Sequence, residues 1–312
     1  MGPRHRFRFG VTVPTVSSGP AWAERARLIE GLGYATLHVP DHFREQLAPV
    51  PALTAVALAT TRLRVGSLVF CNDFRHPVVL AKEAATLDVV SGGRFELGLG
   101  AGWLREEYDQ AGIPFDAPGA RVDRLVEAVA IAKGLLAGER VTFKGRYYAI
   151  AGLEGRPLPV QRPHPPIVIG GGGRRMLTLA AREASIVGLV PGARRDGGGL
   201  DRADFTAAAM LQKIAWVREA AGDRLDSLEL HTLIQAVVMT SDRQAAADQL
   251  ATRFGGIARD VVLESPYVLL GTAAEICETL RQRRDQYGIS YITVFDRDAE
   301  AFAPIVASLS ST

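Results

Sequence analysis

His42 is the residue of this sequence whose type and place point most directly to chemistry, and it stands immediately after Asp41. The pair follows Thr36 to Val39, an apolar stretch that predicts a strand. Imidazole can donate, accept or move a proton near neutral pH, and a strand end directs such a side chain toward a ligand. We therefore take His42 as a catalytic candidate and Asp41 as a residue in contact with a cofactor. The alternative is a histidine held by Asp41 that only shapes the pocket.

A run of glycines in front of two arginines predicts an anion site. The run consists of Gly170, Gly171, Gly172 and Gly173, followed by Arg174 and Arg175. It lies between a strand pattern and a helix pattern, where free amides without Cβ atoms concentrate positive potential. We expect a phosphate group here, with a loose turn as the alternative. Valine at Gly171 or Gly172 is expected to weaken ligand binding and to leave the fold largely intact.

The segment from Phe95 to Trp103 reads as a strand that ends in spaced glycines. A backbone without side chains can lie close to a flat ligand, so Ala101, Gly102 and Trp103 are expected to contact a planar cofactor. A dinucleotide fingerprint would need glycine at position 103, which is Trp. Trp103 could equally plug the top of the fold. Glu107, in the helix pattern that follows, is the second catalytic candidate, although a charge at a helix start is the simpler interpretation.

The composition excludes several classes of function. The six histidines show no paired ligand spacing, so no metal is expected, and no Gly-x-Ser-x-Gly turn is present for acyl transfer. A formal charge of +2 argues against nucleic acid, and no apolar run approaches the length of a membrane span. Cys71 and Cys277 form no motif, which favours a reducing compartment, and Cys71 is expected to be an inert buried thiol. We expect a cytoplasmic protein whose chemistry depends on an organic cofactor.

Strand and helix patterns alternate along the chain and predict a (β/α)8 barrel. Strand patterns fall at residues 7–13, 36–39, 63–70, 95–99, 167–169, 186–190, within 228–239, and at 291–295. Helix patterns fall at 21–32, 51–61, 77–90, 121–137, 174–184, 205–221, from 242, from 273, and at 299–309. Eight strands with following helices favour one barrel domain over residues 1–312, with an insertion around 138–165; a doubly wound sheet is the alternative. Barrel sites lie at the carboxyl ends of the strands, where the candidate residues fall.

Several of these segments also occur, in the same order, in a known family. They are Asp41-His42-Phe43, Arg64 to Val69, Phe74 to Pro77, Ser91 to Arg94, Gly98 to Trp103, Glu107-Tyr108, Gly119 to Arg121, Phe143 to Tyr148 and Pro165 to Gly170. The chain thus resembles the bacterial luciferase-like monooxygenases, and within them the coenzyme F420-dependent oxidoreductases. The resemblance implies a (β/α)8 barrel, a homodimer, and a flavin or deazaflavin across the strand ends with its phosphate near 171–174. It also implies a non-proline cis peptide bond at Leu68–Val69 that backs the ring.

Coenzyme F420 is the expected cofactor and FMN the alternative. F420 carries a phosphate and an acidic tail, which Arg174, Arg175, Arg194 and Arg195 could line. With FMN the same fold would serve as a two-component monooxygenase, and a flavin-binding protein with little catalysis is a third possibility. The substrate is expected to be a small organic molecule, enclosed by residues 104–120 and by a mobile loop at 191–204. The helix at 51–61 and the helix after Pro77 are expected to form a homodimer contact.

Overall fold

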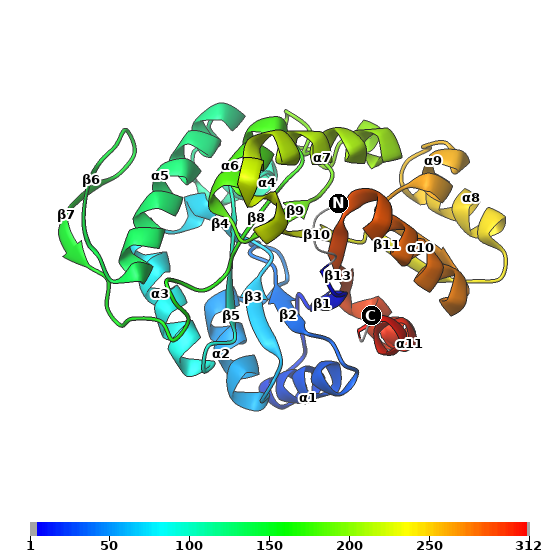
Figure 1. Ribbon diagram of the computed structural model, residues 1–312, viewed down its shortest axis with the longest axis horizontal. Coiled ribbons are helices and arrows are strands. Elements are labelled where there is room, and N and C mark those ends of the chain that lie inside the picture. Colours follow the sequence, from blue (N-terminus) through cyan, green and yellow to red (C-terminus); the bar gives the residue numbers. More distant parts are fainter. Residues whose placement is uncertain (1–4, 311–312) are drawn as a thin grey trace.

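The computed structural model describes residues 5–310, and at its centre eight parallel strands form a closed barrel (Figure 1). The ring runs β3-β2-β1-β13-β10-β9-β8-β5, and β5 pairs with β3 to close it. The barrel strands are β1 (Arg8–Thr12), β2 (Thr36–Val39), β3 (Arg64–Ser67), β5 (Phe95–Gly100), β8 (Ile167–Gly171), β9 (Ile186–Leu189), β10 (Glu229–Leu233) and β13 (Ile289–Phe295). A short strand β4 (Phe70–Cys71) continues β3 after an interruption. The predicted (β/α)8 barrel is confirmed.

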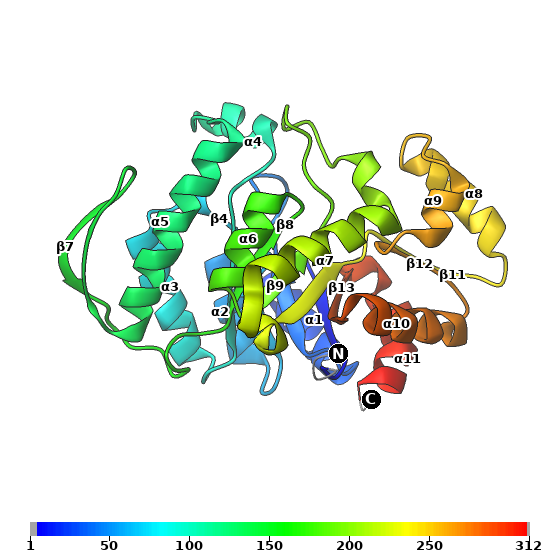
Figure 2. The ribbon, with the colours of Figure 1, turned by 45° about the horizontal axis from the view of Figure 1, so that its top comes forward.

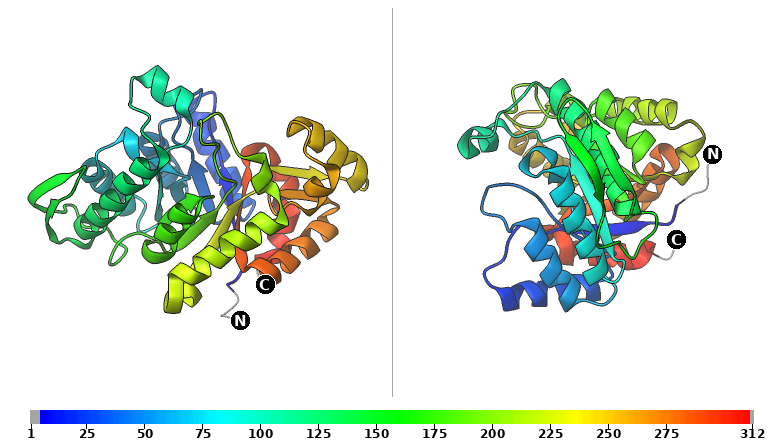
Figure 3. Two further views of the ribbon diagram at one scale, coloured as in Figure 1. Left: turned by 90° about the horizontal axis from the view of Figure 1, so that it is seen from above. Right: turned by 90° about the vertical axis from the view of Figure 1, so that its left-hand side faces the viewer.

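Helices cover the outside of the strands (Figure 3). They are α1 (Gly19–Gly31), α2 (Pro49–Ala59), α3 (Pro77–Val90), α4 (Arg105–Ala111), α5 (Pro118–Ala137), α6 (Arg174–Glu183), α7 (Ala207–Ala221), α8 (Arg243–Arg253), α9 (Arg259–Glu264), α10 (Ala273–Tyr287) and α11 (Ala299–Leu309). Proline stands in the first turn of α2, α3 and α5, where its missing amide hydrogen has no helical partner to lose. The predicted bounds of α3 and α11 agree with the structure.

A second, smaller sheet was not predicted. It pairs β11 (Ala236–Met239) with β12 (Val268–Gly271), and with α8 and α9 it forms an apolar cluster of its own at one end of the molecule (Figure 2). The apolar run at 228–239 holds two strands, β10 and β11, because the chain leaves the barrel after Leu233. A short apolar run does not reveal such a break. Thr272 and Glu275 form a capping box at the start of α10, and Asp242 caps α8.

The insertion contains an antiparallel pair of strands, β6 (Arg140–Lys144) and β7 (Ala149–Glu154). It forms a two-stranded sheet apart from the barrel, next to α5, on the side opposite α8 and α9 (Figure 1). The assignment of residues 1–312 to one domain stays a prediction. Within residues 5–310 no helix has the length and apolarity required to cross a membrane.

The barrel interior is polar at the amino ends of the strands. Glu96 at the start of β5 bonds with Arg8 and Arg64, and Arg8 also bonds with Glu229. Burial works against the charge of Glu96, but the two arginines beside it lower the pKa of its carboxyl group to about 2. The Tyr291 hydroxyl lies 3.3 Å from a Glu96 oxygen. These paired charges fill the end of the barrel opposite the expected site.

Candidate functional site

His42 and Glu107 form a hydrogen-bonded pair at the mouth of the barrel. His42 follows β2 and Glu107 lies in the first turn of α4, and 2.8 Å separates His42 Nδ1 from Glu107 Oε2. The Glu107 side chain is 4% exposed and that of His42 is 23% exposed. When the imidazole is neutral, donation from Nδ1 to the carboxylate leaves Nε2 as an acceptor. The pair can therefore hold or release one proton at Nε2.

An aromatic ring lies beside His42. The Trp103 ring meets the imidazole edge-on, with 5.9 Å between the ring centroids. Phe43, the next residue in the sequence, is 55% exposed and packs at a tilt against Phe74, with 4.4 Å between the ring centroids. A ligand beside the imidazole would thus find both an apolar wall and a proton-handling group. Both interpretations of Trp103 place it here, and its contact with a cofactor stays a prediction.

Asp41 has partners within the protein for both of its carboxylate oxygens. Oδ2 accepts from the Cys71 amide at 2.9 Å and from Arg75 Nη1 at 2.5 Å, and Oδ1 accepts from Arg75 Nη2 at 3.1 Å. The side chain is buried. Asp41 therefore fixes the chain after the third barrel strand to the end of β2. Its contact with a cofactor stays a prediction.

The cis peptide bond expected at Leu68–Val69 is present. It interrupts the third barrel strand between β3 and β4. Leu68 packs against the apolar interior cluster of Val168, Ile186 and Tyr291. The two residues lie between β3 and β4, near the strand ends, and their contact with a planar ring stays a prediction.

The glycines of β5 allow close approach of the chain around Leu68–Val69, a neighbour that the sequence interpretation did not foresee. A Cβ at Gly98 would lie 1.9 Å from the Ser67 carbonyl oxygen, and one at Gly100 would lie 2.5 Å from Val69 Cγ2. The space next to both glycines is therefore filled by the neighbouring chain. Close backbone approach was correctly inferred, but its partner is the protein itself.

Gly102 makes room for a buried tyrosine. Its φ of 75° lies in the left-handed region, and a Cβ there would lie 1.8 Å from the Tyr108 hydroxyl oxygen. That hydroxyl donates to Asp73 Oδ2 at 3.1 Å and lies 3.2 Å from Cys71 Sγ. Burial raises the pKa of the Cys71 thiol to about 12, in agreement with the expected inert thiol. Ala101, beside Gly102, is partly buried against the core.

The glycine run connects β8 to α6, and its members differ in the space around them. A Cβ at Gly171 would lie 2.6 Å from Met176 Cβ, and one at Gly172 would lie 2.3 Å from the Gly192 nitrogen. Gly170 faces the barrel wall, with Val69 Cγ1 3.9 Å from its Cβ position. The structure therefore argues against the expectation that the fold would tolerate valine there, because the Met176 side chain occupies the space at Gly171 and the Gly192 backbone occupies it at Gly172.

Gly173 is the member of the run with open space beside it. It is the N-cap of α6, no heavy atom lies within 4 Å of its Cβ position, and no side chain caps the helix. The first amides of α6 are consequently available to an anion at the mouth of the barrel.

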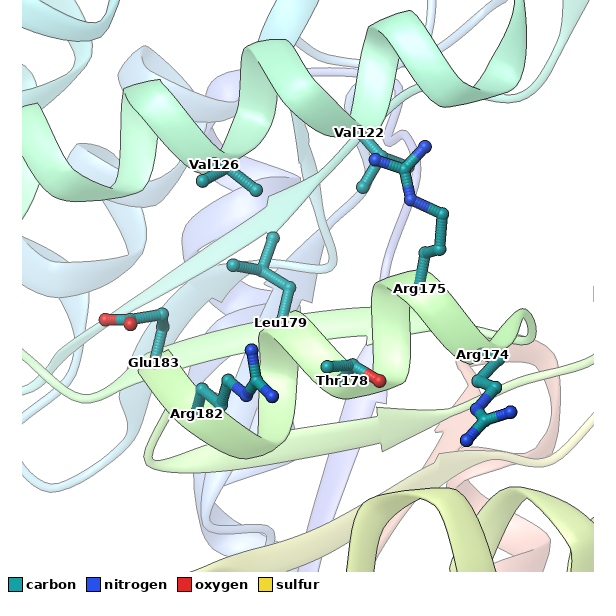
Figure 4. A pocket seen from close by; sticks show the side chains of 8 residues that line it. All are labelled: Val122, Val126, Arg174, Arg175, Thr178, Leu179, Arg182 and Glu183. Carbon is teal, nitrogen blue, oxygen red and sulfur yellow. The ribbon is translucent and has the colours of Figure 1, made fainter. Parts of the chain in front are cut away.

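The arginines after the run point outward and pair with surface carboxylates. Arg174 bonds with Glu219 at 2.9 Å and Arg175 with Asp123 at 2.5 Å. In Figure 4, Arg175 extends from α6 toward the helix of Val122, and Arg174 extends to the opposite side. The groove shown there, about 400 Å³ between α5 and α6, lies on the outer wall of the barrel. Arg194 likewise bonds with Asp196, so Arg174, Arg175 and Arg194 of the predicted arginine rim have partners within the protein.

The sequence interpretation missed a buried lysine, Lys213, which lies behind the glycine run on α7. Its ammonium group bonds with Asp204 at 2.6 Å. A signal was present, because Lys213 falls on the helix face of Met210, Ile214 and Val217, which are buried. A charged residue on a core-facing stripe requires a buried partner.

Comparison with known proteins identifies relatives over most of the chain. The model of the luciferase-like monooxygenase family matches residues 7–292. An F420-dependent glucose-6-phosphate dehydrogenase from Microbacterium testaceum is 34% identical over 187 residues, which cover 57% of this chain and 55% of that protein.

Solved structures share the fold over nearly the whole chain. The coenzyme F420-dependent tetrahydromethanopterin reductase of Methanopyrus kandleri superposes with a TM-score of 0.78 at 17% identity, covering 97% of this chain and 99% of that one. A monooxygenase from Streptomyces bottropensis superposes with a TM-score of 0.75 at 25% identity, covering 96% and 99%. The barrel is thus shared by proteins of both kinds.

Proposed function

The chain belongs to the luciferase-like monooxygenase family, and from this premise we propose that it is a coenzyme F420-dependent oxidoreductase. It transfers a hydride between the deazaflavin ring and a small organic substrate. The observation that carries this proposal is the His42–Glu107 pair at the barrel mouth, in which 2.8 Å separates His42 Nδ1 from Glu107 Oε2 and Nε2 is left as an acceptor. A substrate that accepts a hydride also takes up a proton, and one that gives up a hydride also releases a proton. The His42–Glu107 pair would supply or accept that proton.

The residues present fit a cofactor that has a ring and a phosphate. The open N-cap at Gly173 leaves the first amides of α6 for the phosphate, and Leu68 and Val69, between β3 and β4, would lie against the ring. When bound, the deazaflavin supplies the carbon that gives or accepts the hydride. Trp103 packs edge-on against the imidazole, and Glu107 holds the ring of His42 in one orientation.

The choice of F420 over FMN leads to a direct prediction. The protein is expected to bind F420 at least about tenfold more tightly than FMN, a difference of about 1.4 kcal/mol. The support comes from the 34% identity to an F420-dependent dehydrogenase, since the uncapped α6 fits the phosphate of either cofactor. Fluorescence titration of the purified protein with each oxidised cofactor measures both dissociation constants. Tighter binding of FMN would contradict the proposal.

An FMN-dependent two-component monooxygenase is the second candidate. It is favoured by the likeness to the Streptomyces bottropensis monooxygenase over 96% of the chain. This activity would consume oxygen in the presence of chemically reduced FMN and a substrate, whereas the F420-dependent activity would proceed without oxygen. An oxygen electrode distinguishes the two.

We also propose that the protein is a homodimer. Leu58 on α2 is 73% exposed and Val79 on α3 is 51% exposed, and the two helices are neighbours on one side of the barrel. Burying such a face against a second copy removes apolar area from water. Light scattering at micromolar concentration is expected to give twice the mass of the chain, and Leu58→Glu is expected to shift it to a monomer. A wild-type monomer would contradict this proposal.

A further inference from the structure

Lys213 is a buried cation with partners on two other elements. Its side chain is 1% exposed, and Nζ lies 2.6 Å from Asp204 Oδ2 and donates to the Tyr267 hydroxyl at 3.1 Å. Burial lowers the pKa of Lys213, and Asp204 opposes that change. Removing a charged group from water has a large free-energy cost, so such a pair is retained only where its geometry is well defined. The chemistry at His42 does not use it.

Asp204 connects this lysine to the start of a loop. Its Oδ2 atom also accepts from the Gly192 amide at 2.5 Å, and the Gly192 carbonyl accepts from the Asp201 amide at 2.7 Å. Residues 192–201 form a loop, here called the 192–201 loop, whose two ends are thus joined at Gly192. The loop was expected to be mobile, but its base is bonded to a buried ion pair.

Gly192 in turn packs against the glycine run. The Cβ position of Gly172 lies 2.3 Å from the Gly192 nitrogen and 2.4 Å from its Cα atom, so the two backbones are in direct contact. A shift of Gly192 would therefore move Gly172, and with it the turn into α6. The contacts lead from Lys213 through Asp204 and Gly192 to the amides beside Gly173.

The far end of the loop reaches the helix of Glu107. The Gly197 carbonyl accepts from the Arg105 amide at 3.3 Å, and the Asp196 carbonyl accepts from Arg105 Nε at 3.0 Å. Arg105 is the first residue of α4. The 192–201 loop thus spans the barrel mouth from the glycine run to α4.

We propose that Asp204, held by Lys213, is a positioning residue for the phosphate site at the start of α6. The inference rests on the proposed function, because it assumes a cofactor phosphate at those amides. The Asp204 carboxylate fixes the Gly192 amide, Gly192 fixes Gly172, and the amides of α6 are aligned before the ligand arrives. Preorganised donors bind an anion more tightly than donors that must first be ordered.

The test compares ligands with and without a phosphate. FMN and riboflavin share one ring system and differ by the phosphate. The dissociation constant of riboflavin divided by that of FMN therefore measures the phosphate contribution alone. Asp204→Asn, which removes the charge facing Lys213, is expected to reduce that ratio about tenfold, with riboflavin affinity changed by less than about twofold. Lys213→Met is expected to act in the same direction. F420 and its phosphate-free core give a parallel pair.

Asp88→Asn is the matched control. Asp88 is buried like Lys213 and bonds with Gln161 at 2.6 and 2.9 Å. It lies near the C-terminal end of α3, away from the glycine run. This variant is expected to lower the melting temperature and to leave the ratio unchanged. Tyr267→Phe keeps both Asp204 bonds and is also expected to preserve the ratio.

Three other results of this test would each contradict a specific part of the proposal. If the wild-type protein selects for the phosphate and Asp204→Asn keeps that selectivity, the positioning role is wrong and the proposed function stands. An equal loss of affinity for FMN and riboflavin would assign Asp204 to general stability and overturn the positioning role. If neither phosphate-bearing ligand is preferred by the wild-type protein, the phosphate site itself is wrong and the inference fails with it.

Discussion

Replacing His42 with asparagine is expected to lower turnover by about two to four orders of magnitude, the usual scale for a lost general acid or base. Asparagine keeps a donor and an acceptor at similar size, so it preserves shape and loses proton transfer. Cofactor affinity is expected to change much less, because the amides of α6 lie apart from the imidazole. Steady-state kinetics with a turned-over substrate and cofactor titration measure the two effects separately.

Two further variants define this result. Glu107→Gln is expected to lower turnover as well, and the double variant is expected to lose less than the sum of the two effects, since 2.8 Å separates the paired atoms. His76→Asn is the control: His76 is an exposed N-cap of α3, and asparagine is a good cap there. A greater loss of cofactor binding than of turnover in His42→Asn would make His42 a binding residue and leave Glu107 as the proton partner to test.

Gly173→Val is expected to weaken the binding of phosphate-bearing cofactors by about 10- to 100-fold, with little loss of stability. The backbone of Gly173 is extended, with φ −96° and ψ 153°, and no atom lies within 4 Å of its Cβ position, so valine fits sterically. Its methyl groups would stand in front of the uncapped amides and exclude the phosphate. Titration with FMN and F420 checks the affinity, and thermal unfolding checks the fold.

Gly172→Val supplies the contrast. The Gly192 backbone occupies the space next to Gly172, so this variant is expected to lose about 3 kcal/mol or more of folding free energy. Valine at Gly173 would thus affect ligand binding, whereas valine at Gly172 would affect stability. Unchanged cofactor affinity in a folded Gly173→Val protein would show that the phosphate binds elsewhere.

The sequence by itself determined the architecture and the location of the site. Strand and helix patterns differ in period, so their alternation predicted eight strands, and the rule for barrel strand ends then brought His42, Glu107 and Gly173 to one mouth. The helix bounds at Pro77 and Ala299 were predictable because proline and an apolar stripe act over a few neighbouring residues. The resemblance to a family added the cis peptide bond at Leu68–Val69, which no local pattern encodes.

Only the tertiary structure decided which atoms meet. His42 and Glu107 are 65 residues apart, and no local pattern could show that a carboxylate classed first as a helix-start charge is bonded to the imidazole. The glycines at 98, 100 and 172 all signalled close approach, but sequence does not show whether a ligand or the chain itself is the close neighbour. The arginines after the glycine run were likewise expected at a ligand, and the fold gives Arg174 and Arg175 acidic partners on adjacent helices. The physical reason is common to all these cases: local periodicity fixes which face a side chain lies on, whereas its partner depends on contacts between residues far apart in the chain.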